Sequence, residues 1–216
     1  MKRPLSFLER TYNLVAEMKL GIPMSRALAI LGVAVALASG SVASAVEIAG
    51  VKLDETARVG DQDLKLNGAG IRYKVIFKVY VAGLYLAERK TNLPDILALP
   101  GAKRVTLVML RDVDSDSFGQ AFMDGIRKNS EIAERAKLVS QMLTFGQMFA
   151  SVPEIKKGDV LIVDWIPGAG TICQHNGKKI SEFIPDVAFY NALLKIWLGR
   201  NPADNRLKTA MLGENS

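Results

Sequence analysis

The chain has 216 residues, of which 49% are hydrophobic and 23% charged, so it is long enough for one sizeable core or at most two small ones. Its formal net charge is +6, but its 28 lysines and arginines form no run dense enough for a phosphate-binding stripe, which argues against nucleic acid as a partner. The single cysteine, Cys173, excludes an internal disulfide, so the core has to stabilise the fold.

An uncharged apolar run, Ala27–Ser39, lies near the start of the chain, with Arg26 before it and Ala43, Ser44 and Ala45 soon after it. A basic residue, a short apolar run and an A-x-A site in this order are typical of a secretory signal peptide. As a helix the run would be about 20 Å long, which is less than the roughly 30 Å hydrocarbon core of a bilayer. A permanent membrane anchor is therefore the weaker interpretation.

The predicted signal peptide covers residues 1–45, which is longer than the usual roughly 15–30 residues. Met18 and Met24 each open a segment of ordinary length with a basic residue of its own, so we expect the encoded start at one of them. Removal of the signal takes away five basic and two acidic residues and lowers the net charge from +6 to +3. The mature protein is expected to begin at Val46 and to be periplasmic or secreted.

The first half of the mature chain predicts strands, because its segments are rich in β-branched residues or alternate apolar and polar residues. These segments are Val46–Leu53, Asp63–Gly68, the stretch Gly68–Leu86 read as two strands, and Arg104–Arg111.

Two amphipathic helices are expected next, because apolar residues recur at helical spacing. The first helix is Phe118–Asn129, with Asp114–Ser117 before it as a group of candidate caps, and the second is Ala136–Phe149.

The last third of the chain predicts strands again and then helices. Asn176-Gly177 favours a tight hairpin turn, and Gly199 and Gly213 are placed to end helices. Strands, helices, strands and helices in this order predict one α+β domain over residues 46–216, with a mostly antiparallel sheet covered by a helical layer. The predicted elements of this third are strands in Asp159–Pro167 and Gly170–Ile184, a helix from Pro185 or Asp186 to Leu198, and a short helix Asn205–Leu212.

Side-chain alternation divides the stretch Gly68–Leu86 into two faces. Arg72 shares one face with Lys74 and Lys78, and since arginine is mostly exposed, composition alone makes it a solvated surface residue. The opposite face is expected to be buried and carries Ile71, Tyr73, Val75, Phe77, Val79 and Val81.

The same stretch reads GAGIRYKVIFKVYVAGLYL and resembles the strand pair of the chalcone isomerase fold, where a glycine-rich segment with an arginine leads to glycine, a hydrophobic residue, tyrosine and leucine. The similarity continues in FGQAFMDGIRKN and in AFYNALLKIWLGRNPADNRLKTAMLG, so it covers nearly all of residues 46–213. GDVLIVDWIPGAGTICQHNGK is similar to the hairpin region of the bacterial, exported branch of this superfamily. The resemblance implies an open-faced β-sandwich, a mostly antiparallel sheet covered by helices.

The plant enzymes of this superfamily close a flavanone ring by intramolecular addition, with an arginine on the substrate phenolate and hydroxyl and amide groups around the ketone. Arg72 matches that arginine. The positions that match their threonine, tyrosine, asparagine and second threonine carry Tyr80, Phe118, Gly125 and Ile196 here. Because each missing donor typically costs a factor of about 10²–10³ in rate, these departures argue against that cyclisation.

An arginine at one end of an otherwise apolar cleft suits an amphiphile, whose carboxylate would accept charge-assisted hydrogen bonds from the guanidinium. The superfamily includes fatty-acid-binding members. The resemblance therefore implies an exported, non-catalytic protein that binds a fatty acid or other small amphiphilic carboxylate without a cofactor. The predicted ligand-binding residues are Arg72, Tyr80, Phe118, Phe122, Gly125 and Ile196.

Two other functions stay open, because a fold does not fix a function. One is a diverged intramolecular lyase or isomerase of unknown substrate, which the polar groups of the cleft would distinguish. The other is a structural or assembly partner with a vestigial cleft, which an open cleft would argue against.

Other motifs in the sequence give weaker support for a function. Cys173 and His175 would share a strand face, but a zinc site needs three or four protein ligands and the chain has no other cysteine or histidine, so no metal site is predicted. Residues two apart on a strand also seldom form the hydrogen bond of a Cys–His nucleophile.

Residues 68–71 precede a strand rather than a helix and so lack the context of a dinucleotide-binding loop. Trp165 and Trp197 are expected to pack in the core or at the cleft edge.

Overall fold

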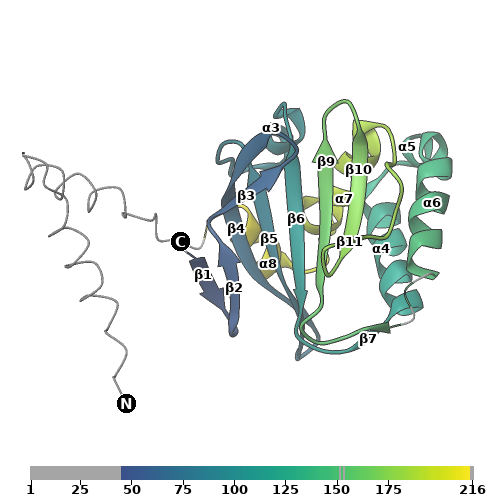
Figure 1. Ribbon diagram of the computed structural model, residues 1–216. Coiled ribbons are helices and arrows are strands. Elements are labelled where there is room, and N and C mark those ends of the chain that lie inside the picture. The colour runs from purple at the N-terminus through teal and green to yellow at the C-terminus, as the bar shows by residue number, and fades with distance from the viewer. Residues whose placement is uncertain (1–44, 151, 153, 215–216) are drawn as a thin grey trace, which may run out of the picture. The chain divides into compact units, whose positions relative to one another are not determined.

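The computed structural model describes the backbone of residues 45–150, 152 and 154–214, which belong to one compact unit (Figure 1). The predicted signal peptide lies outside the described residues, apart from Ala45, which begins the first strand. Within the described ranges, no helix is long and apolar enough to cross a membrane.

A seven-stranded sheet forms one layer of the molecule. Every neighbouring pair in it is antiparallel, and the strand order is β11-β10-β9-β6-β5-β4-β3. A hairpin of β1 and β2 and a short pair of β7 and β8 stand apart from this sheet. The strands are β1 (Ala45–Ile48), β2 (Val51–Asp54), β3 (Thr56–Val59), β4 (Gln62–Lys74), β5 (Phe77–Leu86), β6 (Lys103–Met109), β7 (Val113–Asp114), β8 (Glu154–Ile155), β9 (Val160–Ile166), β10 (Gly170–His175) and β11 (Lys178–Lys179).

Helices gather on one side of the sheet and bury the larger hydrophobic core against it (Figure 1). Helix α7 packs on α4 and β10, α6 packs on α4, and α8 lies on β4 and β5. Asp114, Asp186 and Asp204 cap α4, α7 and α8, because each carboxylate accepts a backbone N–H of the first turn. The helices are α3 (Leu93–Ala98), α4 (Ser115–Asn129), α5 (Ile132–Lys137), α6 (Val139–Ala150), α7 (Val187–Leu198) and α8 (Asn205–Met211).

The α+β class and the mostly antiparallel sheet under a helical layer are confirmed, but some predicted elements differ. The single strand Val46–Leu53 is wrong, because Ala49 and Gly50 have φ values of 51° and 79° and turn the chain back to form the β1–β2 hairpin. The single helix Ala136–Phe149 is also wrong, since Leu138 (φ −107°, ψ 9°) separates α5 from α6. Strand β3 and helix α3 were not predicted.

The predicted alternation of buried and exposed side chains along Gly68–Leu86 is interrupted at the hairpin turn. Val75 is 89% exposed and Phe77 is 55% exposed, so the prediction that they are buried is wrong. The chain turns back between Lys74 and Phe77, which pair across the hairpin. Irregularities in the β4–β5 register also interrupt the two-residue alternation that the sequence predicts.

Gly68 and Gly70 of β4 allow helix α8 to pack closely on the sheet. A Cβ at Gly70 would lie 2.6 Å from the Ala210 methyl group of α8, and a Cβ at Gly68 would overlap the Ala210 carbonyl oxygen. Because glycine has no side chain, α8 can lie directly on β4 at this point. This contact positions the strand that carries Arg72.

Candidate functional site

A pocket of about 290 Å³ lies at the end of the sheet where β4 turns into β5 and where β6 leads into β7. Figure 1 shows both connections at the same end of the sheet. The β4–β5 hairpin, the β6–β7 connection and the first turns of α4 supply its walls. Residues of these three segments that line it include Arg72, Lys74, Phe77, Arg111, Asp114 and Phe118.

Arg72 stands on β4 directly opposite Tyr80 of β5, and its guanidinium carbon lies 5.5 Å from the centroid of the Tyr80 ring. Paired residues of an antiparallel sheet share a face, so Arg72 is on the helix-covered side and not on a solvated one, contrary to the composition-based expectation. Its Nε is buried and has no hydrogen-bond partner, and the described residues contain no ion pair to it. The guanidinium therefore retains donors for an anion.

Tyr80 lies behind Arg72, and its hydroxyl accepts a 2.9 Å hydrogen bond from Nε1 of Trp197. Burial raises the pKa of Tyr80, the positive charge of Arg72 and the bond from Trp197 lower it in part, and Asp204 raises it, so the phenol is protonated at neutral pH. Both oxygens of Asp204 accept backbone N–H groups, one of them from Tyr73. Tyr80 is 2% exposed and is not among the residues that line the pocket.

Phe118 joins the pocket to a cluster of aromatic rings under α4 and α6. Its ring centroid is 6.3 Å from Tyr80, 4.9 Å from Phe122 and 5.6 Å from Phe149. The space beside Phe118 and Phe122 is only about 10 Å³, which is at the lower limit for holding a single water molecule. Side chains therefore fill the apolar end of the predicted cleft, whereas the Arg72 end is open.

Gly125 and Ile196 lie farther along the same layer, where α4 meets α7. A Cβ at Gly125 would lie 2.9 Å from Cγ2 of Ile196, and Ile196 is buried. Neither residue lines the pocket. The six predicted ligand-binding residues thus belong to one sheet–helix layer, with Arg72 and Phe118 at the pocket wall and the other four packed behind it; their role in binding stays a prediction.

Lys74, Arg111 and Asp114 are among the pocket residues that were not predicted to take part in binding. Lys74 and Arg111 add two cations, and the guanidinium carbon of Arg111 lies 5.0 Å from the centroid of the Phe77 ring. Hydrogen bonds from Ser117 lower the pKa of Asp114, the N-cap of α4. Arg111 meets the hairpin because β6 pairs with β5, and sequence patterns do not contain that register.

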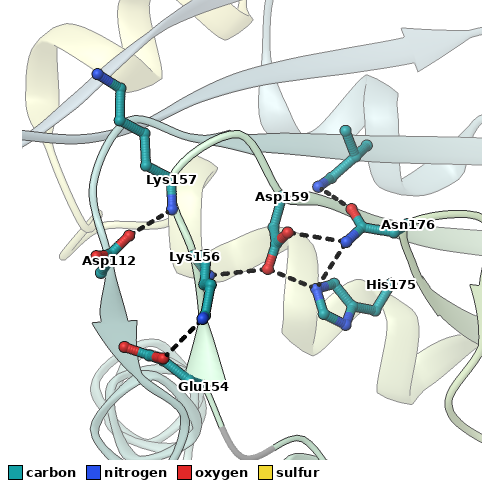
Figure 2. Close-up of polar contacts among 8 residues, drawn as sticks. Asp112, Glu154, Lys156, Lys157, Asp159, His175 and Asn176 are labelled. Carbon is teal, nitrogen blue, oxygen red and sulfur yellow. Dashed lines mark hydrogen bonds and ion pairs between the residues drawn. The ribbon is translucent and has the colours of Figure 1, made fainter.

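A polar network fixes the turn that follows β8, as Figure 2 shows. Asp159 accepts hydrogen bonds from the Asn176 amide at 2.8 Å and from the Lys156 backbone at 2.8 Å, and its Oδ2 lies 2.8 Å from Nε2 of His175. The neighbouring backbone N–H of Lys157 donates to Asp112, which lines the pocket. The network therefore holds the segment that carries Arg111 in place.

Cys173 and His175 do not act on each other. The Cys173 thiol is buried, and burial raises its pKa to about 12 despite a hydrogen bond with Ser181, so it is protonated at neutral pH. The imidazole of His175 is bound by Asp159 and Asn176 instead. Among the residues with described placement, no group of three or more potential ligands could hold a metal ion.

An antiparallel sheet covered by a helical layer is the architecture of the chalcone isomerase-like α+β fold. The chain belongs to the chalcone isomerase-like family, which it matches over residues 45–213.

The crystal structure of a fatty-acid binding protein from Arabidopsis thaliana is similar in fold. The TM-score is 0.60 at 14% sequence identity, over 79% of this chain and 97% of that chain. A search of curated proteins found no match.

Proposed function

We propose that this protein is exported and binds an amphiphilic carboxylate, such as a fatty acid, without transforming it. The observation that carries the proposal is the state of Arg72, a cation at the wall of an open pocket. Its Nε is buried without a hydrogen-bond partner, and Arg72 has no ion pair among the described residues. A buried donor without a partner costs free energy, and a bound carboxylate would remove that cost.

The pocket orients the proposed ligand. Its carboxylate would lie against Arg72, with Lys74 and Arg111 adding positive charge at the wall, and its chain would run towards Phe118. The volume of about 290 Å³ lies at the lower edge of the roughly 300–1,000 Å³ typical of small-molecule pockets. A short chain fits this volume directly, whereas a long chain requires the rings around Phe122 to repack.

The similar structure supports the ligand class only through its fold. The Arabidopsis thaliana protein is described as a fatty-acid binding protein, and at 14% identity the likeness shows a shared architecture. The chemistry of this pocket carries the rest of the argument. It combines cations at the wall with apolar side chains at its inner end, as the two ends of a carboxylic amphiphile require.

A non-catalytic role follows from the groups beside Arg72. The positions that match the donors of the plant enzymes hold Phe118, Gly125 and Ile196, which have no side-chain donor. Tyr80 has a hydroxyl, which accepts the indole N–H of Trp197, but Tyr80 does not line the pocket. The alternative of a diverged lyase or isomerase therefore lacks a positioned acid among these residues.

Titration calorimetry with a fatty acid and the fatty alcohol of equal chain length tests this proposal. Repeating it over several chain lengths measures how far the apolar end can open. We expect the acid to bind at least about tenfold more tightly than the alcohol, because the alcohol offers no charge to Arg72. Equal affinities would contradict a carboxylate site, and no binding of either would favour the alternative of a structural partner with a vestigial cleft.

Export has its own test. N-terminal sequencing of protein recovered from outside the cytoplasm should begin at Val46. Recovery of an intact residue 27–39 segment in the membrane fraction would contradict cleavage and favour an anchor.

A further inference from the structure

The tip of the β4–β5 hairpin is apolar and exposed. Val75 is 89% exposed, Ile76 is 77% exposed and Phe77 is 55% exposed, although they are consecutive and hydrophobic. Single exposed apolar residues are common on protein surfaces, but a contiguous group at a projecting tip marks an interaction site.

The backbone of this turn is as unusual as its exposure. Val75 has φ 59°, in the left-handed region that β-branched residues rarely adopt. Glycine or asparagine is favoured where a two-residue hairpin turn needs a positive φ. Neither solvation nor turn geometry explains a Val-Ile pair at this position, whereas contact with an apolar partner does.

Positive charge surrounds the tip. Lys74 and Lys78 flank it on the two strands, and the guanidinium of Arg111 lies over the Phe77 ring. In the described part of the chain, none of these three cations forms an ion pair.

The nearby acids do not neutralise this charge by direct pairing. They are Asp112 and Asp114, and each accepts a backbone N–H group instead, from Lys157 and Ser117 respectively. An apolar tip within a cationic collar is complementary to an anionic lipid surface, where apolar side chains enter the acyl boundary and cations meet the headgroups.

We propose that the β4–β5 hairpin tip docks the protein on an anionic lipid membrane. Val75 and Ile76 enter the interface, and Lys74, Lys78 and Arg111 contact the headgroups. Lys74, Phe77 and Arg111 also line the pocket, so docking places the pocket at the membrane surface, where an amphiphile can enter it. The cargo rests on the proposed function, but the docking itself does not.

Helix α6 provides a matched control surface. Val139 and Leu143 are 62% and 61% exposed, comparable to the tip residues, yet α6 contains no charged residue. If exposed apolar area alone caused membrane binding, this helix would contribute as much as the hairpin.

Co-sedimentation with vesicles of phosphatidylcholine, with and without phosphatidylglycerol, tests the proposal. The double variant Val75→Asn with Ile76→Thr keeps the turn, since asparagine tolerates a positive φ, and should lower partitioning onto anionic vesicles by about tenfold or more. The control variant Val139→Gln with Leu143→Gln should bind like the wild type. All variants share one N terminus, so differences between them report on the substituted surface.

Two further measurements locate the contact. Emission from the variant Ile76→Trp should be quenched by brominated lipid, and Lys78→Gln should weaken binding to anionic vesicles but not to neutral ones. Unchanged binding of the tip variant, or no quenching at position 76, would overturn the proposal. A wild-type dimer in sedimentation that the tip variant abolishes, together with no vesicle binding, would also overturn it in favour of a second copy of the chain.

The tip variant also separates this inference from the proposed function. In vesicle-free solution it should bind the fatty acid with wild-type affinity, because Val75 and Ile76 are not among the residues that line the pocket. Loss of vesicle binding with retained acid binding supports docking. Acid binding by a wild type that ignores anionic vesicles would overturn docking alone.

Discussion

Arg72 and Tyr80 show how a buried tyrosine positions a partly buried charge. The Tyr80 ring lies beside the guanidinium, and its hydroxyl is held by the indole N–H of Trp197. The strand therefore carries the cation, and helix α7 fixes the ring that supports it. Removal of the hydroxyl should lower the stability of the protein, because Trp197 is 1% exposed and bulk solvent does not reach its indole N–H to replace the lost acceptor.

The variant Tyr80→Phe should lower the free energy of unfolding by about 1–3 kcal/mol, since it leaves the Trp197 N–H buried without an acceptor. Urea denaturation measures this loss. Tyr73→Phe is the control, because the Tyr73 hydroxyl makes no hydrogen bond within the described residues, and its midpoint should stay close to that of the wild type. Equal midpoints for both variants would mean that the Trp197–Tyr80 bond contributes nothing.

At the scale of elements, α4 and α7 approach closely because Gly125 has no side chain. Gly125→Ala would bring a Cβ to 2.9 Å from Ile196, and overpacking of this kind costs about 1–3 kcal/mol. Gly146→Ala on α6 is the matched control, since nothing lies within 4 Å of its added Cβ.

We expect Gly146→Ala to raise the free energy of unfolding by about 0.5–1 kcal/mol, as alanine is favoured over glycine in a helix. Gly125→Ala should fall below this control by the cost of overpacking. Thermal and urea unfolding of both variants provide the comparison. If Gly125→Ala stabilised the protein as much as Gly146→Ala, the two helices would be less tightly packed than the structure indicates.

The turn between β8 and β9 should depend on pH through Asp159. Burial raises the pKa of Asp159, but hydrogen bonds from Asn176, Lys156 and His175 outweigh it and lower the pKa below the ordinary value. A lowered folded-state pKa stabilises the protein above the unfolded pKa of about 3.9, and this contribution disappears as the pH falls through the folded pKa.

Asp159→Asn removes the carboxylate, so the wild type should be more stable than the variant at about pH 5, and the difference should shrink towards about pH 3. Urea midpoints at several pH values measure it. A difference that stays constant over this range would show that the carboxylate charge does not contribute.

At the scale of the whole molecule, elements with strong local signals were predictable from the sequence. The apolar spacing of α4 and the Asn176-Gly177 turn, with φ values of 50° and 77°, are encoded within a few residues, so their predictions are confirmed. The alternation around Val75 failed because a two-residue turn without the usual turn residues is not visible in the pattern. Such a turn resets which face each later residue occupies.

The candidate site was predictable only in part for the same reason. Arg72 came from a family resemblance, and its buried surroundings depend on strand pairing with Tyr80. Arg111 joined the pocket through the β5–β6 register, which involves residues far apart in the chain. The filled apolar end around Phe122 depends on side-chain packing between α4 and α6, which no local pattern contains.

The whole protein should not accelerate the cyclisation of a chalcone appreciably. Phe118, Gly125 and Ile196 replace three donors of the plant enzymes and have no side-chain donor to stabilise developing charge, and each lost donor typically costs about 10²–10³ in rate. The loss of chalcone absorbance with time measures the rate directly. A turnover within about tenfold of that of a plant enzyme would contradict the prediction and require donors from elsewhere in the pocket.

The central claim is that Arg72 anchors a carboxylate. Calorimetry of Arg72→Ala with a fatty acid and the matched alcohol tests it most directly. The affinity for the acid should fall by about 1.5–3 kcal/mol, the range for a hydrogen bond to a charged group, while the affinity for the alcohol stays the same. Arg72→Lys should restore only part of the loss, because an ammonium cannot reproduce the planar guanidinium fork. An unchanged affinity for the acid in a folded Arg72→Ala protein would contradict the account.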